Sequence, residues 1–208
     1  SATPVDPPVF RAMEPFFSNY YGNPSSLHDF GQEAKDAMEE ARNQVARLIG
    51  AEPEEIYFTS SGTESNNFAL FGLTSALKSK GTHIISSSIE HISILNPLKE
   101  LKKQGWEYTL LPVDEYGLVN PRDLKKAIRP ETVLISIMHA NNEVGTIQNL
   151  KELAGIASQN QVVFHSDGVA TAGIIEVDVN DLGLDCYTFS SQQMYGPKGA
   201  AALYIRKG

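Results

Sequence analysis

Short apolar runs alternate with longer amphipathic stretches along most of this 208-residue chain. The short runs have the length of buried strands, whereas the longer stretches repeat apolar residues at helical spacing. Strands that alternate with helices in this way are typical of an α/β fold, in which helices cover both faces of a mainly parallel sheet. The pattern predicts a sheet of the seven-stranded type, built from segments 56–59, 83–86, 108–111, 132–138, 162–165, 186–190 and 201–205.

Helix boundaries follow from capping residues, glycine and proline. The helical period from Ala34 to Ile49 ends at Gly50, a residue that favours the end of a helix. Asn96-Pro97 and Asn120-Pro121 each have the order of an N-cap followed by a first-turn proline. With the apolar spacing, these signals predict further helices over 62–77, 97–104, 121–128 and 150–158.

Polar clusters follow four of the predicted strands. These clusters are Ser60-Ser61-Gly62-Thr63, Glu90-His91, Asn141-Asn142-Glu143 and Asp167. Each alone has an ordinary interpretation as a helix cap, a turn or a histidine without chemistry. In an open α/β sheet, however, ligands bind at the carboxyl ends of the strands. The four clusters together therefore favour a cofactor or substrate site, and the first of them, at a helix N-terminus, suits a phosphate.

Composition and charge argue against several classes of function. The net charge of −8 argues against nucleic acid or an anionic membrane as the main partner. No apolar run reaches the ~18 residues that span a bilayer, and the first residues carry no signal-peptide pattern. A single cysteine excludes an internal disulfide and fits a reducing compartment. We therefore expect one domain over residues 1–208, a cytoplasmic location and no metal site.

One motif near the end of the chain is the most specific. Residues 190–199 read Ser-Ser-Gln-Gln-Met-Tyr-Gly-Pro-Lys-Gly. This segment resembles the pattern Ser-x-His-Lys-x-x-Gly-Pro-Lys-Gly of cysteine desulfurases, in the class V aminotransferase family of fold-type I enzymes that use pyridoxal phosphate (PLP). In that family the first lysine forms a Schiff base with PLP. Here Gln192 replaces the histidine and Gln193 replaces that lysine, and an amide has no nucleophilic amine.

The resemblance extends over essentially the whole chain and implies roles for the polar clusters. It implies that the fold is the large domain of a PLP-dependent transferase. His91 would lie over the pyridine ring and move protons, Asp167 would pair with the ring nitrogen, and Asn142 would contact the phenolic oxygen. Ala170 replaces a glutamine that contacts the same oxygen in the family. The implied phosphate ligands are Gly62, Thr63, Ser190 and Gln192.

The same resemblance implies that parts of the family's machinery are missing from this sequence. The C-terminal small domain, which carries the nucleophilic cysteine and a substrate-binding arginine, would be absent. Cys186 lies in a predicted buried strand and is expected to pack as a small apolar residue. Lys198 has its own counterpart in the family motif, so we do not expect it to replace the lost lysine. Residues 1–6 and 21–28 also match family elements near the substrate pocket.

The resemblance implies sulfur mobilisation from L-cysteine for iron–sulfur cluster assembly, with a homodimer and an iron–sulfur scaffold protein as partners. Because Gln193 cannot anchor the cofactor, PLP would be held non-covalently, and we expect little or no turnover. One alternative is a non-catalytic partner or docking homologue in iron–sulfur assembly. Another is a different class V enzyme, such as a selenocysteine lyase. Bound cofactor would separate the first alternative from an enzyme.

Overall fold

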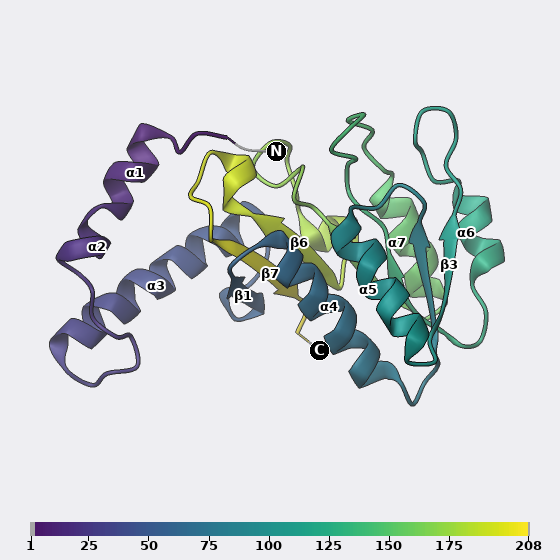
Figure 1. Ribbon diagram of the computed structural model, residues 1–208, viewed down its shortest axis with the longest axis horizontal. Coiled ribbons are helices and arrows are strands. Elements are labelled where there is room, and N and C mark those ends of the chain that lie inside the picture. The colour runs from purple at the N-terminus through teal and green to yellow at the C-terminus, as the bar shows by residue number, and fades with distance from the viewer. Residues whose placement is uncertain (1–2, 208) are drawn as a thin grey trace.

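The chain folds around one seven-stranded sheet in a computed structural model that describes residues 3–207 (Figure 1). Every strand expected from the sequence is present, with bounds that differ by a few residues. This confirms the predicted α/β class. The strands are β1 (Ile56–Thr59), β2 (His83–Ser87), β3 (Glu107–Leu111), β4 (Thr132–Ser136), β5 (Val163–Asp167), β6 (Cys186–Ser190) and β7 (Ala201–Ile205).

The strand order across the sheet is β1-β7-β6-β5-β4-β2-β3. The pairs from β6 through β5, β4 and β2 to β3 are all parallel, whereas β7 is antiparallel to both β1 and β6. The sheet is thus mainly parallel, as predicted. Because β1 is antiparallel to β7, it runs in the same direction as the parallel strands. The carboxyl ends of β1, β2, β4 and β5, which the four polar clusters follow or end, therefore lie at one edge of the sheet.

Helices pack on both faces of the sheet (Figure 1). Apolar residues alternate between the faces, so that Ile84 packs with the helices on one side and Ile85 with those on the other. Helices α4 and α5 cover one face, and α6 and α7 cover the opposite face. The helices are α1 (Pro7–Met13), α2 (Pro15–Ser18), α3 (Asp29–Leu48), α4 (Gly62–Leu77), α5 (Ile92–Lys103), α6 (Pro121–Ala127), α7 (Leu150–Gln159) and α8 (Val179–Leu182).

The prediction that a helix begins at Asn96-Pro97 was wrong. Helix α5 begins at Ile92, and Pro97 lies inside it. The N-cap is His91, whose ring nitrogen Nδ1 accepts a hydrogen bond from the amide of Ser93. A proline in the second turn removes one backbone donor, yet α5 continues past it, and Pro97 is buried. The expected strand 132–138 is also shorter, since β4 ends at Ser136.

The N-terminal part of the chain extends away from the sheet. Helices α1 and α2 and much of α3 form an arm at one side of the molecule, drawn in purple to blue in Figure 1. Helices α1 and α2 bury none of their residues, and the arm carries many exposed apolar side chains. These include Phe10, Phe16, Phe17, Tyr20, Tyr21, Leu27 and Phe30.

Candidate active site

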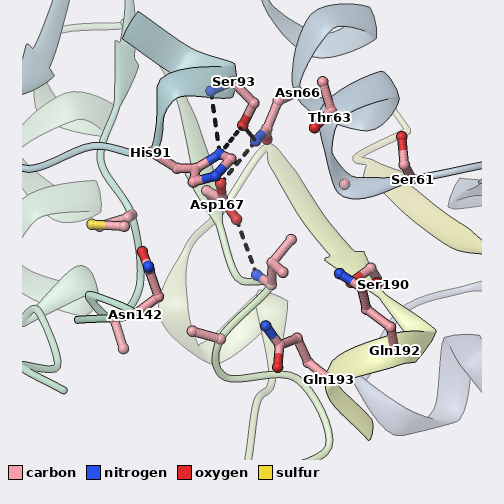
Figure 2. Close-up of a pocket in the computed structure, with 15 residues that line it drawn as sticks. Ser61, Thr63, Asn66, His91, Ser93, Asn142, Asp167, Ser190, Gln192 and Gln193 are labelled. Carbon is pink, nitrogen blue, oxygen red and sulfur yellow. Dashed lines mark hydrogen bonds between the residues drawn. The ribbon is translucent and has the colours of Figure 1, made fainter. Parts of the chain in front are cut away.

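A cavity of about 180 Å³ lies at the carboxyl edge of the parallel strands. Its walls come from the turn before α4, the start of α5, the loops after β4 and β5, and the segment after β6 (Figure 2). All the candidate site residues named from the sequence line this one cavity. They are Gly62, Thr63, His91, Asn142, Asp167, Ser190, Gln192 and Gln193.

The N-terminus of α4 forms one wall of the cavity. Ser61 caps the helix, because its side-chain oxygen accepts from the amide of Glu64 at 3.1 Å. The Glu64 carboxylate in turn accepts from the amide and hydroxyl of Ser60, and these bonds lower the pKa of Glu64. The first four amides of a helix have no partner within it, so Gly62 and Thr63 contribute further donors at this end. Such a turn attracts an anion.

Ser190 supplies a hydroxyl beside that helix end. It ends β6, is 4% exposed, and its Oγ has no hydrogen-bond partner among the described residues. A buried hydroxyl without a partner costs free energy, so a ligand atom that accepts from it would be stabilised. This orphaned donor and the α4 amides together fit the phosphate group of a cofactor.

Asp167 ends β5 at the floor of the cavity and is 5% exposed. Its Oδ1 accepts from the amide of Val169 at 3.0 Å, and its Oδ2 accepts from Nδ2 of Asn66 at 2.8 Å (Figure 2). Burial raises the pKa of Asp167, while these two hydrogen bonds oppose that rise. The carboxylate is therefore desolvated and would be stabilised by a cationic N–H in the cavity.

His91 lies at the mouth of the cavity, exposed to solvent. Its Nδ1 accepts from the amide of Ser93 at 3.2 Å and therefore carries no proton. The Ser93 hydroxyl, 2.7 Å from the same nitrogen, must then donate to it, which places the ring proton on Nε2. The contacts of His91 thus select one tautomer.

Two residues that sequence reasoning did not assign connect this histidine to the aspartate. Asn66 donates through its side-chain nitrogen to Ser93 Oγ at 2.8 Å and also to Asp167. Both Asn66 and Ser93 are buried and line the cavity. The available signals were weak: Asn66 lies one helical turn after Gly62, and Ser93 lies two residues after His91. A series of hydrogen bonds, from Asp167 through Asn66 and Ser93 to His91, orients both titratable side chains of the cavity (Figure 2).

Glu90 is buried beside this cluster but does not line the cavity. Its Oε1 accepts from the Ser87 hydroxyl at 2.6 Å and from the amide of Met138 at 2.8 Å, while Oε2 has no partner among the described residues. Burial raises the pKa of Glu90 to about 8. Glu90 therefore connects the loop that carries His91 to the loop after β4, in its protonated form at neutral pH.

The segment that carries Gln192 and Gln193 forms the wall opposite His91. It is the short 3-10 helix η2 (Ser191–Met194), followed by Tyr195 in the left-handed conformation with φ 58°. The carbonyl of Tyr195 accepts from the amide of Asp6 at 2.9 Å, and the Thr3 hydroxyl donates to the carbonyl of Gln192. The start of the described chain thus holds this segment in place.

The remaining sequence predictions have mixed outcomes. Asn142 lines the cavity, and its amide donates to the carboxylate of neighbouring Glu143 at 2.7 Å. Lys198 does not line it, in agreement with the sequence prediction. Cys186 is fully buried in β6, and burial raises the pKa of its thiol to about 12. Residues 21–28 do not line the cavity, and Ser1 and Ala2 lie outside the described residues.

The fold is that of the class V aminotransferase group of PLP-dependent enzymes. The Aminotransferase class-V family profile matches residues 1–208. The chain belongs to this family.

Curated relatives of the chain carry the name cysteine desulfurase, and solved structures of related proteins share its fold. The chain is 53% identical over 208 residues to "Cysteine desulfurase IscS" of Dictyoglomus turgidum, of which it covers 53%. A solved structure titled "NIFS-LIKE PROTEIN" superposes with a TM-score of 0.97 at 40% identity, over 100% of this chain and 57% of that one. Another, "SspA in complex with cysteine", gives 0.96 at 38% identity, over 99% and 59%. The chain thus spans about half the length of the proteins it matches.

Across residues 3–207, no helix is both long enough and apolar enough to cross a membrane. The described residues also contain no group of three or more histidine, cysteine, aspartate or glutamate side chains that could hold a metal ion.

Proposed function

We propose that this chain forms the PLP site of a cysteine desulfurase-type protein, with the cofactor held non-covalently. The observation that supports this most is the convergence of all the candidate residues on one cavity at the carboxyl edge of the sheet. The sequence similarity extends over the whole chain and supports the same assignment.

The phosphate end of the proposed site is the wall formed by α4 and β6. Gly62 and Thr63 would bind the phosphate through the helix N-terminus, and the Ser190 hydroxyl would donate to it. Gln192 is close enough to line the same cavity and offers an amide donor. These donors are neutral, so the helix dipole supplies the electrostatic attraction.

The ring end is the proposed site of the chemistry. PLP supplies an electron sink that activates bonds of an amino acid substrate. Asp167 would hold a proton on the pyridine nitrogen, and Asn66 keeps that carboxylate oriented. His91 presents Nε2–H because Ser93 occupies Nδ1, which suits it to packing over the ring and passing a proton. Asn142 would contact the phenolic oxygen.

The amide of Gln193 limits the turnover that we expect from this chain. A side-chain amide cannot form the covalent bond to the cofactor that a lysine makes at this position in the family, and it cannot serve as a base at neutral pH. We therefore propose that the chain mobilises sulfur from L-cysteine slowly or not at all. The proposed partners are an iron–sulfur scaffold and a second copy of the chain, and the proposed location is the cytoplasm. The exposed apolar arm supports an interface.

Two matched serine variants test the cofactor site. Ser190 and Ser166 are both buried strand serines whose hydroxyls lack a partner among the described residues, but only Ser190 lines the cavity. We expect Ser190→Ala to weaken PLP binding about tenfold, because one hydrogen bond to a charged phosphate is lost. Ser166→Ala should leave binding unchanged. Titration followed by intrinsic fluorescence would measure both, and equal effects would contradict the assignment.

Turnover is a separate measurement. Sulfide and alanine production from L-cysteine, with PLP added, should be absent or far below that of a lysine-containing relative. Turnover at the relative's rate would contradict the proposed role of Gln193. The replacement of that lysine favours a second candidate, a non-catalytic docking homologue. A chain that binds no PLP yet associates with an iron–sulfur scaffold would support that candidate over the first.

A further inference from the structure

We propose that the site favours an amino acid whose side chain is uncharged, aliphatic and larger than that of alanine, such as leucine, because an apolar groove opens beside the cavity. This inference rests on the proposed function, since it assumes that the cavity binds a vitamin B6 phosphate beside an amino acid substrate. It is carried by the wall that the cavity and the groove share, and by the side chains that line the groove.

The groove has a volume of about 360 Å³ and adjoins the cavity. It lies between the loop after β4 and the segment after β5. Four residues line both the cavity and the groove, namely Ala140, Asn142, Ala170 and Gln193. Position 170 contributes only a methyl group to this shared wall. A ligand larger than the cavity would therefore extend into the groove.

The proposed orientation of the cofactor directs a substrate towards this shared wall. Asp167 would pair with the pyridine nitrogen, and the carbon of PLP that reacts with an amino acid is attached to the ring directly opposite that nitrogen. An amino acid held at this carbon would lie at the end of the cavity away from Asp167 and Asn66. Figure 2 shows Asn142 and Gln193 at that end, and both belong to the shared wall. The substrate side chain would thus have the groove beside it.

The polar side chains of the groove already have partners within the protein. Asn141 Oδ1 accepts from the amide of Glu143 at 2.9 Å, and Asn142 donates to the carboxylate of the same glutamate at 2.7 Å. Thr171 Oγ1 donates to the carbonyl of Gly168 at 3.0 Å. Among the described residues that line the groove, none carries a charge. A charged substrate side chain would therefore lose its hydration there without gaining an ion pair.

The apolar part of the groove comes from three isoleucines, Ile147, Ile174 and Ile175. Ile147 is 50% exposed and Ile174 is 57% exposed, so both have apolar surface that a ligand can remove from water. Aliphatic surface of this kind, next to a cavity with a few polar groups, is the usual arrangement of a small-molecule site. The groove therefore favours an aliphatic side chain over a charged one.

Comparison of three ligands on the unmodified protein tests the inference. In phosphopyridoxyl amino acids, a carbon–nitrogen single bond joins the cofactor to the amino acid, so their binding needs neither a lysine nor turnover. Calorimetric titration would use the L-leucine, L-alanine and L-aspartate compounds. We expect the leucine compound to bind about tenfold more tightly than the alanine compound, because its additional carbon atoms are partly buried in the groove. The aspartate compound should bind more weakly than either.

The possible outcomes separate this inference from the proposed function. Equal affinities for the leucine and alanine compounds, or tighter binding of the aspartate compound, would overturn the inference and leave the cofactor site intact. Failure of all three compounds to bind would instead refute the proposed cofactor site.

Three exposed isoleucines provide matched variants. Ile147 and Ile174 line the groove, whereas Ile92, which is 64% exposed at the start of α5, does not. Ile147→Ala and Ile174→Ala should each reduce the ratio of the leucine and alanine affinities to about threefold, because apolar contact surface is lost. Ile92→Ala should leave that ratio unchanged. A ratio that is unaffected by both groove variants, or reduced as much by Ile92→Ala, would overturn the assigned role of the groove.

Discussion

At the scale of single residues, a close approach behind the cavity depends on one glycine. A Cβ atom at Gly168 would lie 1.9 Å from Cζ of Tyr187 and 2.1 Å from its hydroxyl oxygen. Tyr187 is fully buried, and its hydroxyl is hydrogen-bonded to Thr171 Oγ1 at 2.7 Å and His139 Nδ1 at 3.0 Å. The ring therefore cannot move aside without breaking these bonds. Because Gly168 follows Asp167 directly, this contact also fixes the floor of the cavity.

We predict that Gly168→Ala lowers the free energy of unfolding by about 1–3 kcal/mol, the usual cost of overpacking a core. Tyr187→Leu alone should also be destabilising, because it leaves a void. The double variant should be less destabilised than the sum of the two single variants, since leucine makes room for the new methyl group. Denaturant unfolding of all four proteins measures this coupling, and simple additivity would contradict the proposed clash.

The positions of most site residues could be predicted from the sequence, but the contacts that orient them could not. Gly62, Asp167 and Ser190 could be predicted because each follows or ends a strand in a pattern that the family shares. Asn66 and Ser93 could not be assigned, because their role depends on two elements that meet only in the folded chain. A polar residue in a helix is usually exposed, and no spacing rule distinguishes the buried exception.

At the scale of elements, the N-terminus of α4 has two roles. It caps a helix that packs against the sheet, and it presents amides to the cavity. Helix α6 offers a matched comparison, because Asn120 caps it through a bond from the amide of Arg122 at 2.9 Å and lies far from the cavity residues in the sequence. Loss of either cap should therefore lower stability, whereas only loss of the Ser61 cap should also weaken ligand binding.

We predict that Ser61→Ala and Asn120→Ala each lower the free energy of unfolding by about 1 kcal/mol. Only Ser61→Ala should also weaken binding of a vitamin B6 phosphate, because the cap orients the turn that binds the phosphate. Thermal unfolding with and without ligand measures both effects. A ligand-induced rise in Tm that is as large for Ser61→Ala as for Asn120→Ala would show that the α4 turn does not contact the phosphate.

Helix α5 shows where local sequence signals fail. Asn96-Pro97 has the residues of a helix start, but α5 begins at Ile92, with Pro97 inside it. The true cap is His91, a residue type that rarely caps helices, and it acts through its ring nitrogen. Packing of Ile94 and Leu98 in the core outweighs the missing backbone donor at the buried Pro97.

At the scale of the whole molecule, buried titratable groups determine how stability depends on pH. Burial lowers the pKa of His83 and His139 to about 4 and that of His165 to about 3. Each histidine stays neutral in the folded state while its unfolded counterpart, with a pKa of 6.5, takes up a proton. The stability that these neutral histidines contribute is fully present above pH 6.5 and is lost as the pH falls towards 4.

Glu90 has the opposite effect. Its pKa of about 8 in the folded state exceeds the value of 4.5 for an unperturbed glutamate, because burial disfavours the charged form. Its contribution is therefore complete below pH 4.5 and is lost as the pH rises through 8. With the histidines, this predicts a maximum of stability near pH 6.5. Each group changes the free energy of unfolding by at most about 1.4 kcal/mol per pH unit.

We predict that the urea midpoint rises from pH 4 to about 6.5 and then falls towards pH 8. Glu90→Gln should flatten the fall, because the amide keeps an acceptor for Ser87 and Met138 but has no proton to lose. Glu115→Gln makes the same substitution at an exposed site and should leave the fall unchanged. A midpoint of the parent protein that is constant between pH 6.5 and 8 would contradict the raised pKa of Glu90.

The fold as a whole was the most predictable feature. Strands β2, β4 and β6 are buried along their whole length, so the pattern of apolar runs in the sequence was enough to locate them. The exposed apolar side chains of α1 and α2 could not be predicted, because the sequence of an amphipathic helix does not say whether its apolar face meets this chain or another.

The burial of Cys186 has a practical consequence. This chain has a single cysteine, Cys186, which is fully buried in β6, the strand that ends at Ser190. A thiol reagent such as a maleimide dye can reach it only when that strand detaches, and a thiolate forms readily only after release into water. The rate of labelling therefore reports spontaneous opening of the sheet beside the cavity, and occupancy of the cavity by a small molecule should slow the dye without any engineered probe.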